Sequence, residues 1–168
     1  MPAARKWRPG VLGTAGSVTE AIYGLILATS VIAVSREYVS RNAGLVAVTV
    51  LTTSVVFWLG HVYARTLAKS LTDARIPRRS EAGALLRHDW PLVEVTAPLV
   101  LVLALGALDI LSDEASILAA MLAAVGELAG TGGYAARIAG AGVIGTVLSG
   151  AVAAGLGAVV VLLKVLVH

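Results

Sequence analysis

The chain has 168 residues, of which 58% are hydrophobic and only 14% are charged. A soluble domain carries roughly a quarter of charged residues, so most of the apolar surface must face lipid. The 13 basic residues lie between apolar runs and form no single face, which excludes a nucleic-acid-binding surface, and the absence of cysteine excludes disulfides, thiolate metal sites and cysteine nucleophiles.

Five apolar segments are predicted to cross the membrane, because a helix needs about 20 apolar residues to span the hydrocarbon core. They cover residues 17–34, 45–64, 91–111, 115–129 and 138–163. The stretch "GTGGYAAR" separates the last two, and glycine clusters favour turns, so five spans are preferred to four. The predicted fold is an all-α, polytopic membrane helix bundle that forms a single transmembrane domain over residues 1–168.

The sizeable polar stretch is residues 65–90, predicted to be a cytoplasmic loop with a short interfacial helix before Trp90. Asp89 is expected to cap the third span, with Pro91 in its first turn. A second proline, Pro98, is expected to kink that span.

The basic residues predict the orientation, since they are enriched in cytoplasmic loops. Ten lie on the side of the N-terminus, namely Arg5, Lys6, Arg8, Arg65, Lys69, Arg75, Arg78, Arg79, Arg87 and Arg137. The other side has three, namely Arg36, Arg41 and Lys164. The N-terminus is therefore predicted to be cytoplasmic. Arginine exceeds lysine and alanine is abundant, as in bacteria with GC-rich genomes, which indicates a bacterial plasma (inner) membrane.

Four ionisable residues are expected inside the membrane at a similar depth, near its inner side. They are Glu20, His61, Glu94 and Glu127. Intramembrane carboxylates and histidines are costly, so they pair with one another or serve a function. Counting back equally along the first two spans from their turn near Val39 brings Glu20 opposite the stretch from Trp58 to His61.

The Glu20–His61 pair has two interpretations that the sequence leaves open. In the first it is a structural clamp between two helices, with the Trp58 indole donating to it and Arg65 neutralising a glutamate. In the second the intramembrane residues form a site for a transported ion. A divalent cation bound by Glu20, His61 and the other two glutamates, Glu94 and Glu127, is a further hypothesis, and it is the only cofactor that the sequence suggests.

The last span carries two rows of small residues, which allow close approach of another helix. One row contains Gly142, Thr146 and Gly150, and the other contains Gly145, Ser149 and Gly157. They are predicted either to pack within the chain or to form the seam of a homo-oligomer.

The first two spans resemble the opening helix hairpin of the non-canonical, two-repeat potassium channels of lysosomes and prokaryotes. "VTEAIYGL", residues 18–25, resembles their Phe-Ser-Asp-Ala-Val-Phe-Ala-Ile stretch, and "FWLGHVYARTL" resembles their second helix. The resemblance covers residues 17–67. It implies that the first helix lines a pore, that Leu25 forms its constriction, and that Thr19, Glu20, Trp58 and His61 brace that helix. As a whole, the chain resembles the small, uncharacterised integral membrane proteins of actinobacteria.

Three functions follow from these patterns, in descending order. The first is an oligomeric cation channel or carrier with an intramembrane Glu/His network, whose partners are the lipid bilayer and further copies of the chain. The second is a non-transporting scaffold or partner subunit assembled through the glycine-rich last helix. The third is a lipid-modifying membrane enzyme, which a deep polar cavity open to the inner leaflet near His61 and His88 would favour. No nucleophile elbow, phosphate loop, dinucleotide fingerprint or zincin motif is present, so we predict no enzymatic activity.

Overall fold

The computed structural model describes residues 15–38, 42–76 and 78–166. Within these residues the secondary structure is helical, without strands. The helices are α1 (Ala15–Tyr38), α2 (Ala43–Asp73), α3 (Arg79–His88), α4 (Pro91–Glu94), α5 (Ala97–Ala107), α6 (Asp113–Ile138) and α7 (Val143–Leu166). The orientation signals at Arg5, Lys6, Arg8 and Arg41 lie outside the described residues, as do the side chains of Arg36 and Lys164, so the cytoplasmic N-terminus stays a prediction.

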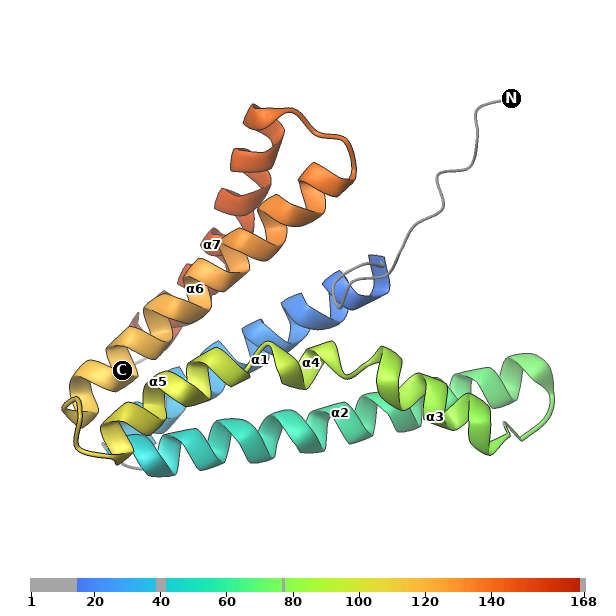
Figure 1. Cartoon of the computed structure of the whole chain (residues 1–168), viewed down its shortest axis with the longest axis horizontal. Helices are drawn as coiled ribbons and strands as arrows, with labels where there is room; N and C mark the ends of the chain where they lie inside the picture. The colour runs from blue at the N-terminus through green and yellow to red at the C-terminus, as the bar shows by residue number, and fades with distance from the viewer. Residues whose placement is uncertain (1–14, 39–41, 77, 167–168) are drawn as a thin grey trace.

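Helix α1 lies in the middle of the molecule, between the α6–α7 hairpin on one side and α2 with α4–α5 on the other (Figure 1). The end of α5 and the starts of α2 and α6 lie together at one end of the bundle, and the helices diverge from there (Figure 1). A hydrogen bond joins the starts of α2 and α6, since the Ala43 N–H donates to Asp113 Oδ1 at 2.9 Å. The N-terminal half of α1 consequently lies at the end where α2 gives way to α3.

Side-chain caps mark where two of the long helices begin. Asn42 accepts a hydrogen bond from the Leu45 N–H at 3.0 Å, and Ser112 accepts one from the Ala115 N–H at 3.3 Å. Such caps satisfy backbone donors that have no partner in the first turn of a helix. At its other end α2 is closed by Ala74, which has a left-handed backbone with φ 50°.

Three of the described helices, α1, α2 and α6, are long and apolar enough to cross a membrane. A fourth span results if α3–α4 and α5 are counted as one broken helix, bent by 47°. This bend confirms the predicted kink in the third span, and it falls at Val95 and Thr96, just before Pro98. In α7 the apolar helical stretch is shorter, Val143–Val159, so the five predicted spans are not all confirmed.

Two predicted boundaries are wrong. Helix α2 continues to Asp73, past the predicted end of the span at residue 64, so the first part of the predicted loop 65–90 is helical. The "GTGG" stretch, residues 130–133, is no turn but lies inside α6. The turn follows at residues 139–142, where Gly140 has φ +87°.

One glycine of "GTGG", Gly132, is used for close packing against α7. A Cβ on Gly132 would lie 2.6 Å from the Ala153 Cβ, and a Cβ on Gly150 of α7 would lie 2.9 Å from the Ala129 carbonyl oxygen. Small residues on both helices therefore let the α6 and α7 backbones approach closely. Inside a membrane no water can replace a lost backbone hydrogen bond, and this favours a continuous helix over a turn at these glycines.

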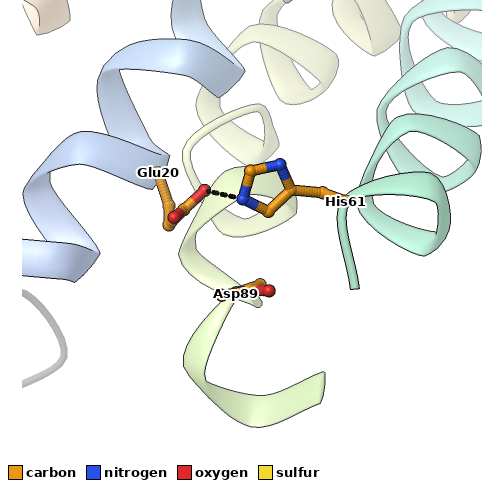
Figure 2. Close-up of side chains that lie close together, drawn as sticks. All are labelled: Glu20, His61 and Asp89. Atoms are coloured by element: carbon orange, nitrogen blue, oxygen red, sulfur yellow. Dashed lines mark ion pairs between the residues drawn. The ribbon is translucent and has the colours of Figure 1, made fainter. Parts of the chain in front are cut away.

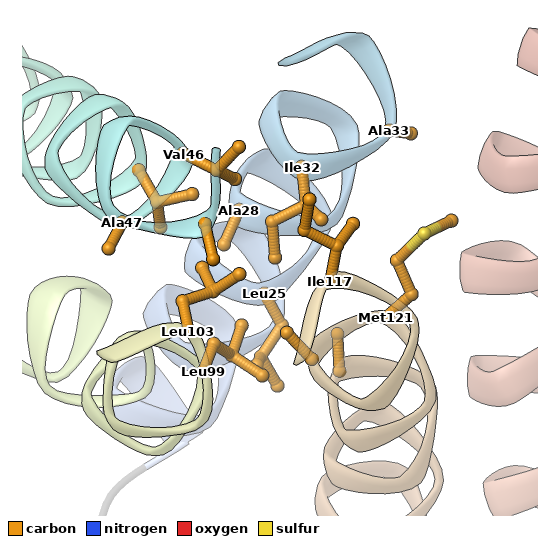
Figure 3. Packing of buried hydrophobic residues seen from close by; sticks show 14 of the residues in the cluster. Leu25, Ala28, Ile32, Ala33, Val46, Ala47, Leu99, Leu103, Ile117 and Met121 are labelled. Carbon is orange, nitrogen blue, oxygen red and sulfur yellow. The ribbon is translucent and has the colours of Figure 1, made fainter. Parts of the chain in front are cut away.

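The hydrophobic core joins α1, α2, α5 and α6 (Figure 3). Its completely buried large side chains include Leu25, Ile32, Val46, Val50, Leu99, Leu103 and Leu128. The core fills the space between these helices from the middle of α1 to the end of the bundle where α2 and α6 begin (Figures 1 and 3). Toward the opposite end, the buried side chains between the helices include the polar Glu20 and Asp89.

Candidate functional site

Glu20 on α1 faces His61 on α2, as the count along the predicted hairpin indicates (Figure 2). Glu20 Oε2 lies 3.0 Å from His61 Nε2, and the exposed fractions of the two side chains are 3% and 28%. The two atoms are within the distance of an ion pair, which forms when the imidazole is protonated, but neither atom has a hydrogen-bond partner. The contact therefore joins α1 to α2 without a directional hydrogen bond.

Asp89 is the third member of the site, and the sequence did not suggest it. Its predicted role as the N-cap of the third span is wrong, because Asp89 is the C-cap of α3 and Trp90 precedes the first turn of α4. Pro91 does lie in that first turn. The Asp89 side chain is completely buried and points toward the space beside Glu20 and His61 (Figure 2).

Arg65, one turn after His61 on α2, lies between the two carboxylates. Its Nη1 is 3.5 Å from Glu20 Oε1, and it makes a short ion pair with Asp89 Oδ1. The same atom is 3.1 Å from His88 Nδ1, which in turn is 3.0 Å from Asp89 Oδ1. The guanidinium thus contacts one oxygen of each carboxylate. Its contact with Glu20 agrees with the expectation that Arg65 neutralises a glutamate. Arg65 can reach both carboxylates because α2 continues past residue 64.

Trp58 does not take its predicted place in this network. Its indole N–H donates to the Leu86 carbonyl oxygen at 3.3 Å, and its ring meets that of Trp90 edge to face, with centroids 5.3 Å apart. Trp58 therefore fixes α3 against α2 and does not donate to the Glu20–His61 pair. Thr19, also expected to brace the first helix, has an exposed side chain.

Two of the expected intramembrane carboxylates lie apart from the site. Glu94 is exposed, because α4 buries the three residues before it against its neighbours. Glu127 is only partly buried on α6. Among the described residues, the group with ligand atoms close enough to hold a metal is Glu20, His61 and Asp89, whose atoms lie within 4.8 Å of one another. The four-residue set predicted from the sequence is therefore replaced by this group.

The hydrogen bonding of the group is unlike that of other buried polar side chains. Thr29 and Ser54, for example, donate to carbonyls one turn back in their own helices, at 2.7 and 2.8 Å. Among the described residues, the buried side-chain atoms without a hydrogen-bond partner are Glu20 Oε2, His61 Nε2 and Asp89 Oδ2. An unsatisfied buried polar atom costs about 1–3 kcal/mol, and here all such atoms belong to one group.

Leu25 and much of the small-residue rows pack within the chain. Leu25 is completely buried in the core, where it packs among apolar side chains (Figure 3). The Ser149 hydroxyl donates to the Gly132 carbonyl at 2.8 Å, and a Cβ on Gly157 would lie 2.7 Å from Leu128 Cδ1. Much of the proposed oligomer seam thus packs within the chain, against α6. Gly142 is exposed, whereas Gly145 and Thr146 are partly buried.

Comparison of the chain with protein-family models, curated proteins and solved structures gives no significant match. Function is therefore inferred from the chemistry of the Glu20–His61–Asp89 group. This group offers two carboxylates and an imidazole beside a guanidinium, with no hydroxyl or thiol nucleophile among its members. Such a set is suited to binding a cation or passing a proton.

Proposed function

We propose that the protein is a multi-pass cation carrier of a bacterial inner membrane, and that it binds its cation at the Glu20–His61–Asp89 group. The observation that carries the proposal is the convergence of Glu20, His61 and Asp89 on one place between α1, α2 and the end of α3, where each has a buried polar atom without a hydrogen-bond partner. Ionisable groups among membrane-spanning helices mark ion pathways, because burying them without a partner is costly. A bound cation would satisfy all three atoms at once.

The packing around Leu25 favours a carrier over a permanently open channel. On α1, Leu25 follows Glu20 by little more than one helical turn, and it is completely buried together with Leu99, Leu103 and Leu128. An ion leaving the group along α1 would meet this apolar core. Passage therefore requires the helices to move relative to one another, and the break between α4 and α5 supplies a point where they can bend.

One chain is sufficient for the proposed binding site. Glu20, His61 and Asp89 all come from the same chain, so a further copy is not needed to complete their arrangement. The rows of small residues on α7 are largely occupied by α6, which weakens the case for a scaffold assembled through that helix. We therefore prefer transport to the scaffold interpretation.

The proposal is tested by cation flux into liposomes that contain the purified protein. Dyes inside the vesicles report the uptake of K⁺, Na⁺, H⁺, Mn²⁺ and Zn²⁺ in parallel. We expect flux of at least one of these ions. The Glu20→Gln variant should lose most of that flux. Glu94→Gln is the matched control, because Glu94 is an exposed carboxylate outside the group, and it should transport like the wild type.

Two outcomes would contradict transport through this group. One is the absence of flux for every ion of the panel in vesicles that contain folded protein. The other is a flux that Glu20→Gln leaves unchanged, since the ion would then follow a path that does not involve the buried carboxylate.

A further inference from the structure

We infer that the cation bound by the Glu20–His61–Asp89 group is a divalent first-row transition-metal ion, such as Mn²⁺ or Zn²⁺. The ligands are a carboxylate oxygen from Glu20, a carboxylate oxygen from Asp89 and His61 Nε2. As a statement about the transported ion this rests on the proposed function, but as a statement about binding it is tested separately. It deepens the proposal by naming the class of ion and by adding Asp89 to its ligands.

The distances within the group are close to those of a metal site. The ligand atoms lie within 4.8 Å of one another. Donors bound to one such ion at about 2.0–2.2 Å lie between about 2.8 Å apart, as neighbours in an octahedron, and about 4.4 Å apart, as opposite corners of one. Side-chain rotations would therefore bring all three donors onto one ion.

The donor types select the class of ion. Ca²⁺ takes six to eight oxygen ligands, and K⁺ is bound by rings of carbonyl oxygens, whereas this group contributes two carboxylates and one imidazole. Imidazole nitrogen suits Zn²⁺ and other transition metals, and carboxylate oxygen suits Mn²⁺ among others. A mixed set with both donor types is therefore best matched by a divalent transition-metal ion.

Arg65 divides the carboxylate oxygens into two kinds. It contacts Glu20 Oε1 and Asp89 Oδ1, while Glu20 Oε2 and Asp89 Oδ2 have no hydrogen-bond partner. The guanidinium thus holds one edge of each carboxylate and leaves the other oxygen available to a ligand. Two carboxylates and one guanidinium give a net charge of −1 when the imidazole is neutral, so the group attracts a cation even with Arg65 in place.

The group lies close to the surface on the side of α2. Glu20 and Asp89 are buried, as is the Nε2 atom of His61, but the His61 side chain is 28% exposed and that of Arg65 is 38% exposed. The exposed part of the imidazole ring thus marks the side from which an ion would approach.

The first experiment measures Zn²⁺ binding to the full chain in detergent by equilibrium dialysis, with the metal counted by mass spectrometry. We expect about one high-affinity Zn²⁺ per chain. Glu20→Gln and Asp89→Asn, which preserve side-chain shape, should each weaken that binding at least about tenfold, whereas Glu94→Gln should bind like the wild type. Zn²⁺ binding that neither Glu20→Gln nor Asp89→Asn weakens would overturn the inference, as would the absence of a high-affinity ion in the wild type.

A second measurement uses the wild-type protein, so it does not depend on whether a variant of a metal-ligand residue still folds. Pulsed electron paramagnetic resonance of bound Mn²⁺ detects a directly coordinated imidazole through coupling to its nitrogen. We expect the signal of one imidazole nitrogen, and a His61→Gln variant that folds should lose it. Bound Mn²⁺ without nitrogen coupling would refute the assignment of His61.

The binding and flux experiments separate the two proposals. Flux of K⁺, Na⁺ or H⁺ that depends on Glu20, in a protein that does not bind Zn²⁺ or Mn²⁺, would refute this inference and leave the carrier proposal standing. Zn²⁺ binding that depends on Glu20 and Asp89, in a protein that transports no ion, would confirm the metal site and refute the carrier.

Discussion

Gly24 is the position where a single methyl group should disturb both the bundle and the candidate site. It lies on α1, one turn after Glu20, and packs against α4. A Cβ at Gly24 would overlap the Leu92 carbonyl oxygen and would lie 3.0 Å from both Leu92 C and Val95 Cγ2. The Leu92 atoms that the new methyl group would meet belong to the backbone, so they cannot rotate out of the way.

The size of the effect follows from these distances. Unstrained carbon–carbon contacts lie at about 3.5–4.0 Å, so in Gly24→Ala α1 and α4 must separate by about 0.5–1 Å. Overpacking of this kind costs about 1–3 kcal/mol. A ligand constellation must be held to about 0.5 Å, and Asp89 lies just before α4. The same substitution should therefore reduce Zn²⁺ affinity by moving Asp89 away from Glu20.

The assay compares Gly24→Ala with Gly130→Ala by equilibrium unfolding in mixed detergent micelles. Gly130 lies inside α6, and a Cβ there would meet nothing within 4 Å, so Gly130→Ala gains the helix propensity of alanine without a clash. We expect Gly24→Ala to have a free energy of unfolding lower than that of Gly130→Ala by about 1–3 kcal/mol. Equal stability of the two variants, with equal Zn²⁺ affinity, would refute the close packing of α1 on α4.

Three further substitutions test the packing and the helix ends, each by the free energy of unfolding. Gly132→Ala should be less stable than Gly130→Ala by about 1–3 kcal/mol, because a Cβ at Gly132 would lie 2.6 Å from the Ala153 Cβ; equal stability would argue for a turn in place of the α6–α7 contact. Asp113→Ala should lower stability by about 1–3 kcal/mol, since it leaves the Ala43 N–H without its acceptor, whereas Asp113→Asn keeps an acceptor and should be close to the wild type. Ala74→Gly should raise stability by about 1 kcal/mol, because Ala74 has φ 50° and only glycine adopts that conformation without strain; the control Ala64→Gly, in the interior of α2, should lower it by a similar amount.

The pairing of Glu20 with His61 shows how far local patterns reach. The two residues lie on consecutive helices, and equal counts from the predicted turn place Glu20 level with the stretch from Trp58 to His61; in the structure it faces His61. The positions of α1 and α2 follow similarly from apolar runs that are long enough to span a bilayer. Arg65, one helical turn after His61, is placed near Glu20 by the same argument.

The rest of the site depends on contacts between segments that no local pattern relates. Asp89 looks like a helix cap in the sequence, and only the packing of α3 and α4 beside α2 brings its carboxylate to Arg65. Glu94 has the same charge and a similar position in the sequence, but the register of α4 turns it outward. A five-residue difference along the chain thus decides which carboxylate joins the group.

From the sequence alone one can establish an all-helical chain suited to a membrane, the hairpin of its first two helices and the meeting of Glu20 with His61. These depend on composition, segment length and the constant rise of a helix, which are properties of each segment by itself. The tertiary structure decided that "GTGG" lies inside a helix with Gly132 packed against α7, that Leu25 belongs to the core and that Asp89 completes the group. The reason is that a glycine, a leucine or a carboxylate acquires its role from the neighbouring helix, and the sequence of one segment does not specify which neighbour that is.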